Sequence, residues 1–237
     1  MKILDEIIAS LPLDSPVHNV CTCVFLTAVV SRHCGLASTL RDETTPHRPV
    51  TDAGSLTQKS ALELAEYARS DNLLEAAIGI AAINSLLDID ESQCVETNAY
   101  DILAQEGKGK KIAIVGHYPF IPRLQSVARK LWVIEKRPRE GDFPAEEAAN
   151  ILPQADVVAI SGTSLINHTL ENLLNLCHNS FVVIVGPSCP LSPVLFNYGV
   201  DVLAGAKVVE AEAVIEGISQ GATLRQVKGI KLLAMKR

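Results

Sequence analysis

Three short loops hold the residues of this chain whose types and spacing suit the binding of a small molecule. They are Gly116-His117-Tyr118-Pro119-Phe120, Ser161-Gly162-Thr163-Ser164 and Gly186-Pro187-Ser188-Cys189-Pro190. Each contains a glycine, which lets the backbone approach a ligand closely, and two contain small hydroxyl side chains. Two of the loops lead into expected helices, whose first N–H groups can hold an anion. We therefore expect ligand contacts from Gly116, His117, Gly162, Gly186 and Ser188.

The first loop stands where a dinucleotide fingerprint would be, but it has a single glycine, and Pro119 and Pro122 remove backbone donors. This composition disfavours NAD or FAD in the standard pose. Glu135 follows the loop's glycine by nineteen positions, where an acidic residue accepts ribose hydroxyls. That arrangement suits an adenosine-containing ligand without a pyrophosphate, such as S-adenosylmethionine. The alternative is a surface ion pair of Glu135 with Arg137 or Arg139, and both interpretations stay open.

The second and third loops each allow two interpretations. Thr163 or Ser164 can bind a ligand or cap the following helix, and Asn167 lies in its first turns. The cluster of hydroxyls and an amide at one strand end favours ligand binding. In the proline-rich third loop, Ser188 and Cys189 are expected to form a rigid pocket wall. A nucleophilic role for Cys189 needs a nearby base, which the sequence does not supply.

Two groups of residues have the side chains that ligate metals. Cys21 and Cys23 share one face of an expected strand, and with Cys34 they could face either a metal or the core. Zinc sites favour two to four residues between paired cysteines, so we interpret these cysteines as buried core. Three histidines are candidates to meet at the junction of two domains and hold a metal: His47, His117 and His168.

The elements that position the three loops follow from hydrophobic periodicity. Beyond residue 108, short apolar runs alternate with helical stretches. Strands are expected at 111–115, 132–134, 156–160, 181–185 and 200–203. Helices are expected from 116 to about 130 and at 144–152, 165–177 and 210–219. This order predicts a Rossmann-like parallel sheet with helices on both faces, and ligands of such sheets bind at the carboxyl ends of the strands.

The segment before residue 108 predicts a small α+β domain. Residues 17–30 and 36–40 are rich in strand-forming types, and 57–69 has helical spacing of apolar residues. The helix expected at 73–87 is apolar nearly all round and should therefore be buried. We divide the chain into an N-terminal domain, 1–108, and a Rossmann-like domain, 109–237.

Composition excludes several classes of function. Of the 237 residues, 48% are hydrophobic and only 4% aromatic, and the net charge is −6. An acidic chain lacks the positive field that nucleic-acid binding requires. No run reaches the ~18–20 apolar residues of a membrane span. Without an export signal the six cysteines are expected to be reduced, which indicates the cytoplasm. No Gly-x-Ser-x-Gly, His-Glu-x-x-His or Walker pattern supports triad hydrolysis, zinc-dependent proteolysis or phosphoryl transfer.

Several separated motifs resemble known families. Residues 35–40, 54–56 and 72–84 resemble the DUF4213 domain, and residues 115–120, 161–167 and 186–188 resemble the DUF364 family, labelled "putative heavy-metal chelation". The resemblance implies an enolase N-terminal-like domain followed by a Rossmann-like domain, with the site between them. The resemblance implies that four residues of the N-terminal domain line this cleft: Gly35, Ser38, Thr39 and Gly54. The resemblance also implies a threonine at position 189. This chain has Cys189 there, so it lacks the hydroxyl that a threonine would supply.

Three functions fit these observations. The first is a protein that binds a metal-chelating small molecule resembling a flavin, pterin or siderophore. An enzymatic form of this hypothesis adds condensation or hydrolysis of that molecule. The second is an S-adenosylmethionine-binding, methyltransferase-like protein, and the third is a non-catalytic protein that binds or delivers a divalent heavy metal. Whether the chain is an enzyme stays open. Apolar residues on the N-terminal strands or at 194–202 are compatible with a homodimer.

Overall fold

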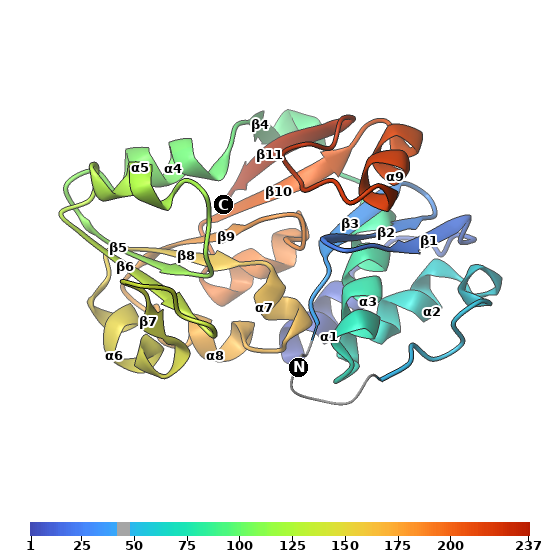
Figure 1. Cartoon of the computed structure of the whole chain (residues 1–237), viewed down its shortest axis with the longest axis horizontal. Coiled ribbons are helices and arrows are strands. Elements are labelled where there is room, and N and C mark those ends of the chain that lie inside the picture. The colour runs from blue at the N-terminus through green and yellow to red at the C-terminus, as the bar shows by residue number, and fades with distance from the viewer. Residues whose placement is uncertain (42–47) are drawn as a thin grey trace.

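The computed structural model describes residues 1–41 and 48–237 and contains two sheets that lie side by side along the long axis of the molecule (Figure 1). A three-stranded sheet belongs to the N-terminal part, and an eight-stranded mixed sheet belongs to the remainder. Helices flank both sheets. The predicted α/β fold, with a small N-terminal α+β part and a Rossmann-like sheet, is confirmed.

The N-terminal part is an antiparallel meander, in sheet order β1-β2-β3, with helices packed against it. Its elements are α1 (Lys2–Ala9), β1 (Asn19–Thr22), β2 (Leu26–Val30), β3 (Cys34–Ser38), η1 (Leu56–Gln58), α2 (Ala61–Ala65), η2 (Glu66–Arg69) and α3 (Leu73–Leu86). The run 17–30, expected as one strand, forms two strands because the chain reverses at Val24 and Phe25. Cross-strand pairing in this hairpin places Cys21 opposite Ala28.

Helix α3 is buried along nearly its whole length, as its apolar composition predicts. Ten of its fourteen residues are buried, and Asn72 caps its N-terminus by accepting a hydrogen bond from the Leu74 N–H at 3.1 Å. Because the helix has no polar face, other elements must cover it on every side. The three-stranded sheet packs on one side, and α2 and η2 pack on another.

The opposite face of the three-stranded sheet is covered by a helix from the far end of the chain. Val214 and Ile218 of α9 (Ala211–Ser219) pack against Leu26 and Leu36 of β2 and β3. Figure 1 shows α9 on one side of this sheet and α3 on the other. The N-terminal sheet therefore depends on a C-terminal helix for half of its apolar covering.

The eight-stranded sheet has the strand order β4-β11-β10-β9-β8-β5-β6-β7. Its strands are β4 (Cys94–Glu96), β5 (Lys111–Val115), β6 (Lys130–Glu135), β7 (Phe143–Pro144), β8 (Val157–Ser161), β9 (Phe181–Val185), β10 (Val202–Val208) and β11 (Ile230–Lys236). The six strands from β7 to β10 are parallel, and their order reverses direction between β5 and β8, as in a doubly wound Rossmann sheet. Ligands of such sheets bind at that reversal.

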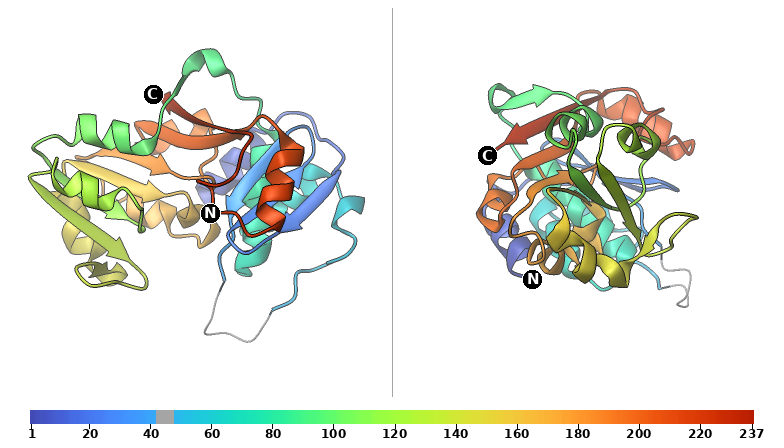
Figure 2. Two further views of the ribbon diagram at one scale, coloured as in Figure 1. Left: turned by 45° about the horizontal axis from the view of Figure 1, so that its top comes forward. Right: turned by 90° about the vertical axis from the view of Figure 1, so that its left-hand side faces the viewer.

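Successive residues of each central strand point to opposite faces of the sheet and enter two different clusters of the core. On β5, Ile112 and Ile114 pack with α4 (Ala99–Glu106) and α5 (Ile121–Gln125). Ala113 packs on the other face, with α6 (Ala148–Ile151), α7 (Thr163–Ile166) and α8 (Leu170–Leu174). Figure 2 shows helices on both faces. The near absence of polar residues in these strands follows from this double burial.

The differences from the expected elements occur where the local sequence signal is weak. The helix expected at 165–177 is broken in two at His168, and the helix expected from 116 begins only at Ile121 and ends at Gln125. Strands β4, β7 and β11 were not expected. β11 runs antiparallel to β10, so the sheet is mixed rather than wholly parallel. The boundary at residue 108 stays a prediction, and β4, which precedes it, pairs with β11.

None of the helices in the described part of the chain has the length and apolar character needed to cross a membrane.

The packing of α3 on η2 leads to a prediction for Gly79. A Cβ atom at Gly79 would lie 2.5 Å from the Cα of Ala68, which is backbone and cannot move aside. We expect Gly79→Ala to lower the free energy of unfolding by about 3 kcal/mol, measured by chemical denaturation.

Gly217→Ala is the matched control, because Gly217 is also helical and its added Cβ would lie 3.8 Å from Ala222 and Val227. That substitution should be neutral or stabilise by up to about 1 kcal/mol. Equal losses in the two variants would contradict the packing explanation.

Candidate functional site

A cleft with a volume of about 880 Å³ lies at the carboxyl ends of β5, β6 and β8, where the sheet order reverses. This volume is within the usual range for small-molecule sites, roughly 300–1,000 Å³. The N-terminal part contributes Ser38, Leu40, Arg41 and Leu73 to its lining. The Rossmann-like part contributes the rest, including Gly116, His117, Tyr118, Glu135, Lys136, Arg137, Arg139, Glu146, Ser161, Thr163, Ser164, Asn167, Thr169 and Asn172. The cleft therefore lies between the two parts.

The loop after β5 turns sharply into the cleft at Gly116, whose φ of +112° favours glycine. A Cβ atom there would lie 3.1 Å from the Cβ of Ser161, so the absence of a side chain also keeps the two strand-end loops close. Tyr118 then donates a hydrogen bond to the Val185 carbonyl at 3.2 Å and stacks on Phe120 with ring centroids 5.0 Å apart. Burial raises the pKa of Tyr118, so its phenol stays protonated and serves as a donor.

His117 is oriented by a carboxylate that the sequence analysis did not single out. Its Nδ1–H donates to Oδ2 of Asp142 at 3.1 Å, and the same oxygen accepts the Arg139 N–H at 3.1 Å. The Asp142 side chain is only 6% exposed, so this carboxylate is directed inward rather than toward solvent. With Nδ1 engaged, Nε2 is the ring nitrogen that remains for a ligand. A histidine held in this way can accept a proton, because the carboxylate stabilises the resulting imidazolium.

The hydroxyls after β8 do not cap the following helix. Gly162 occupies the N-cap of α7, without a side-chain cap, and Thr163 instead donates to the Ser161 hydroxyl at 2.8 Å. Ser164 is 3% exposed, and its Oγ has no hydrogen-bond partner among the described residues. A buried hydroxyl without a partner costs about 1–3 kcal/mol. These observations favour ligand binding over capping for this loop.

The break in the helix at His168 shapes the next part of the cleft wall. His168 has a φ of +58°, and its Nε2–H donates to the Ala68 carbonyl at 2.8 Å, which joins α7 to η2. The break leaves Asn167 and Thr169 facing the cleft, where the Thr169 hydroxyl donates to Asn167 Oδ1 at 2.6 Å. The hydrogen bond of His168 therefore connects this wall of the cleft to the N-terminal part.

The three candidate histidines have different environments. His117 lines the cleft, His168 is bonded to a backbone carbonyl, and His47 lies outside the described residues. Within residues 1–41 and 48–237, no group of three or more His, Cys, Asp or Glu side chains is arranged to hold a metal ion.

Several residues expected in the cleft connect or pack the two parts instead. Ser188 is 1% exposed, and its Oγ accepts the Ser38 N–H at 2.8 Å. Asn84 Nδ2 reinforces this junction by donating to the Pro187 carbonyl at 3.2 Å. A Cβ atom at Gly162 would lie 2.6 Å from the Cys189 N, so this glycine permits the β8 and β9 loops to pack.

Four more candidates lie outside the lining of the cleft. Gly35 faces α3, where an added Cβ would lie 2.7 Å from the backbone carbon of Asn84, and Thr39 shares a hydrogen bond with the Thr27 hydroxyl. Gly54 lies in an exposed turn with a φ of +95°. Gly186 has a φ of +110° and begins the β9 loop beside Tyr118.

Four basic side chains line the cleft, Arg41 from the N-terminal part and three from the loop after β6, and together they are called the basic rim: Arg41, Lys136, Arg137 and Arg139. Two acidic residues, Glu135 and Glu146, also line it. Eight charged residues lie between positions 135 and 147. The sequence gives no sign of which of them face a ligand, which is why the basic rim and Asp142 were not predicted.

A family model for DUF364, described as "Putative heavy-metal chelation", matches residues 98–235. The chain belongs to the DUF364 family. A second model with the same description, DUF4213, matches residues 4–87. The predicted resemblance is confirmed for both segments.

Relatives of this DUF364 protein include an uncharacterized protein of Methanocaldococcus jannaschii, 28% identical over 186 residues, which cover 75% of this chain and 71% of the relative. A crystal structure of a DUF364 protein of unknown function from Desulfitobacterium hafniense matches with a TM-score of 0.87 and 26% identity, covering 100% of this chain and 98% of that one. Another, from Pyrococcus horikoshii, has a TM-score of 0.86 and 22% identity, with the same coverage, and supports the fold.

The bond between His168 and Ala68 leads to a second prediction. His168→Ala should lower the free energy of unfolding by about 1 kcal/mol, because the hydrogen bond is lost while the positive φ remains. His168→Gly should be more stable than the alanine variant by about 1 kcal/mol, because glycine adopts this backbone conformation without strain. His178→Ala, at an exposed position, is the control and should change stability by less than about 0.5 kcal/mol. An alanine variant at 168 as stable as the glycine variant would show that the backbone there is unstrained.

Proposed function

We propose that this chain binds a metal-chelating small molecule with anionic oxygens, of the flavin, pterin or siderophore type, in the cleft between its two parts. The basic rim supports this proposal most directly. Four cationic side chains line one cleft of a protein whose net charge is −6, against two carboxylates on the same lining. A local excess of positive charge in an acidic protein favours an anionic ligand.

The division of roles in this proposal follows from the lining of the cleft. The basic rim attracts and orients the anionic groups of the ligand. Ser161, Thr163 and Asn167 of the lining offer hydrogen bonds, and the Ser164 hydroxyl gains a partner when the ligand is bound. The metal is held by donor atoms of the small molecule itself.

The pairing of His117 with Asp142 supports a chemical step at this site. A neutral imidazole that donates through Nδ1 can remove a proton through Nε2, and such general-base catalysis serves both condensation and hydrolysis. In this part of the proposal His117 activates a water molecule or a ligand hydroxyl, and Asp142 fixes the tautomer.

A second candidate ligand is S-adenosylmethionine, and the position of Glu135 favours it. Glu135 ends β6, the strand next to β5 on the side where the ribose-binding acid of a Rossmann sheet lies. Its Oε1 accepts the Lys136 N–H at 2.8 Å, which leaves Oε2 for a ligand hydroxyl. Glu135 also lines the cleft.

A panel of ligands tests the first proposal. Thermal unfolding is measured with flavins, pterins, tetrapyrroles and siderophores, each with and without metal, and with divalent metals alone. A ligand at about 100 times its dissociation constant stabilises the protein by about 2.7 kcal/mol, or roughly 5–10 °C. We expect a shift with one chelator class. A shift with metals alone would favour metal delivery instead, and no shift with any chelator would contradict the proposal.

Arg139→Gln identifies the role of the basic rim. Loss of one charged hydrogen bond costs about 1.5–3 kcal/mol, so calorimetry should show roughly 10- to 100-fold weaker binding of the chelator. Arg129→Gln is the control, because Arg129 is exposed and does not line the cleft. Equal affinities in the two variants would remove the rim from the proposal.

The adenosine alternative is tested separately with Glu135→Gln. If S-adenosylmethionine binds, this substitution should weaken it about tenfold, since a carboxylate accepts both ribose hydroxyls better than an amide. Calorimetry with wild-type protein that detects no binding at millimolar concentration excludes this ligand.

A further inference from the structure

Two cysteine thiols lie against each other outside the cleft. The Sγ atoms of Cys21 and Cys23 are 2.9 Å apart, and both residues are half-buried. Cys21 lies on β1 and Cys23 directly follows the strand, and side chains two positions apart along a strand direction point the same way. The Cys23 N–H donates to the Leu26 carbonyl at 3.0 Å, which closes the β1–β2 turn and holds the second thiol beside the first.

The pair is accessible from the turn but backed by apolar side chains. Val24 and Phe25, at the tip of the hairpin, are 56% and 49% exposed. Behind the thiols, the cluster formed by β2, β3 and α9 includes Leu26, Ala28 and Val214. Neither cysteine lines the cleft. The pair is therefore a separate feature, open to solvent on one side and apolar on the other.

The surroundings make the Cys23 thiol a poor nucleophile. Burial, together with the neighbouring Cys21 thiol, raises the pKa of Cys23 to about 12. The thiolate is the reactive form in disulfide exchange, so a protonated Cys23 thiol exchanges slowly at neutral pH. A metal ion acts differently, because it displaces the thiol protons as it binds.

We propose that Cys21 and Cys23 form a chelating site for one soft divalent metal ion that accepts two thiolate ligands, as Hg(II) does. On binding, both S–H protons pass to solvent, two metal–sulfur bonds form, and no oxidation state changes. Two thiolates balance the charge of a divalent ion, and the neutral product suits an apolar, half-buried position. Soft ions prefer thiolate ligands, whereas zinc favours four ligands in structural sites. This site is independent of the function proposed for the cleft.

The test is retention of Hg(II) against a competing monothiol. Reduced full-length protein is given one equivalent of Hg(II), dialysed without oxygen against excess glutathione, and its metal content is measured. A single cysteine loses the ion to the monothiol, whereas a chelating pair keeps it. We expect one ion per wild-type chain, with release of two protons per ion bound, and no retention of Zn(II) under the same conditions.

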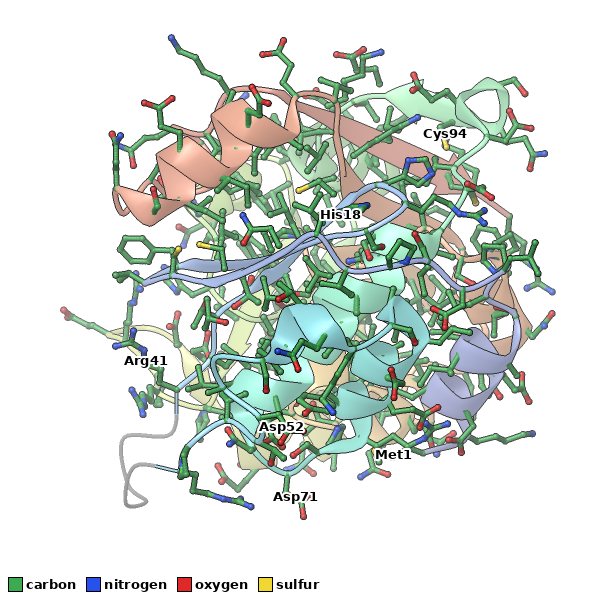
Figure 3. All side chains as sticks on the ribbon, turned by 90° about the vertical axis from the view of Figure 1, so that its right-hand side faces the viewer. Met1, His18, Arg41, Asp52, Asp71 and Cys94 are labelled. Carbon is green, nitrogen blue, oxygen red and sulfur yellow. The ribbon has the colours of Figure 1, made fainter. Side chains whose placement is uncertain are left out.

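Cys21→Ser and Cys23→Ser should each retain at least tenfold less Hg(II) than wild type. Cys94→Ser is the matched control, because Cys94 is also half-buried but belongs to β4. Figure 3 shows Cys94 on the opposite side of the view from Arg41, which lines the cleft. This control should retain the ion as wild type does.

A measurement on the wild-type protein covers the case in which a serine variant fails to fold. Over an exposure long enough to alkylate both thiols of the metal-free protein, bound Hg(II) should protect Cys21 and Cys23, as read by mass spectrometry of peptides. Protection of other cysteines, no retained ion in wild type, or full retention by either single variant would overturn the proposal.

Discussion

Helix α3 has no polar face, and the rest of the structure is arranged around its burial. Ten of its residues are buried, and the only way to achieve this in water is to surround the helix with other elements. A sheet packs against one side and η2 against another, and glycine at positions 35 and 79 permits backbone-to-backbone contact at both. The hydrophobic core around α3 is continuous with the core on one face of the eight-stranded sheet, so the two parts of the chain share a hydrophobic cluster.

This shared burial explains why the cleft has two walls. Hydrogen bonds from Ser38 to Ser188, from Asn84 to Pro187 and from His168 to Ala68 join the parts beside the strand ends. The polar residues of the strand-end loops therefore line one cleft together with Ser38 and Arg41. The strand-end loops at the reversal of the strand order form one wall of the cleft. The N-terminal part, which contains α3, forms the other.

The sequence predicts those parts of the fold that depend on strong periodicity. The central strands β5, β8 and β9 and the buried helix α3 were expected close to their observed limits, because double burial leaves nearly unbroken apolar runs. Strands β4 and β11 were not expected, because their mutual pairing is long-range: Leu233 of β11 pairs with Glu96, far earlier in the chain. Strand β7 was not expected because it is only two residues long and has no periodicity of its own. The break at His168 was also missed, since a positive φ at a histidine has no sequence signature. In the cleft, Gly116, His117 and Glu135 could be predicted because strand ends are predictable. Asp142 could not, because its position depends on how a charged loop folds back.

The covering of the three-stranded sheet by α9 has a consequence for synthesis of the chain on the ribosome. Leu26 and Leu36 leave the ribosome well before Val214 and Ile218, which shield them, are made. From Leu87, which follows α3, to the end of α9 at Ser219 is 219 − 87 = 132 residues. At about 5–20 residues per second, the outer face of the nascent sheet stays uncovered for roughly 7–26 s. During that interval this apolar surface is open to chaperones and to other nascent chains, so the N-terminal part reaches its final form only after α9 has been made.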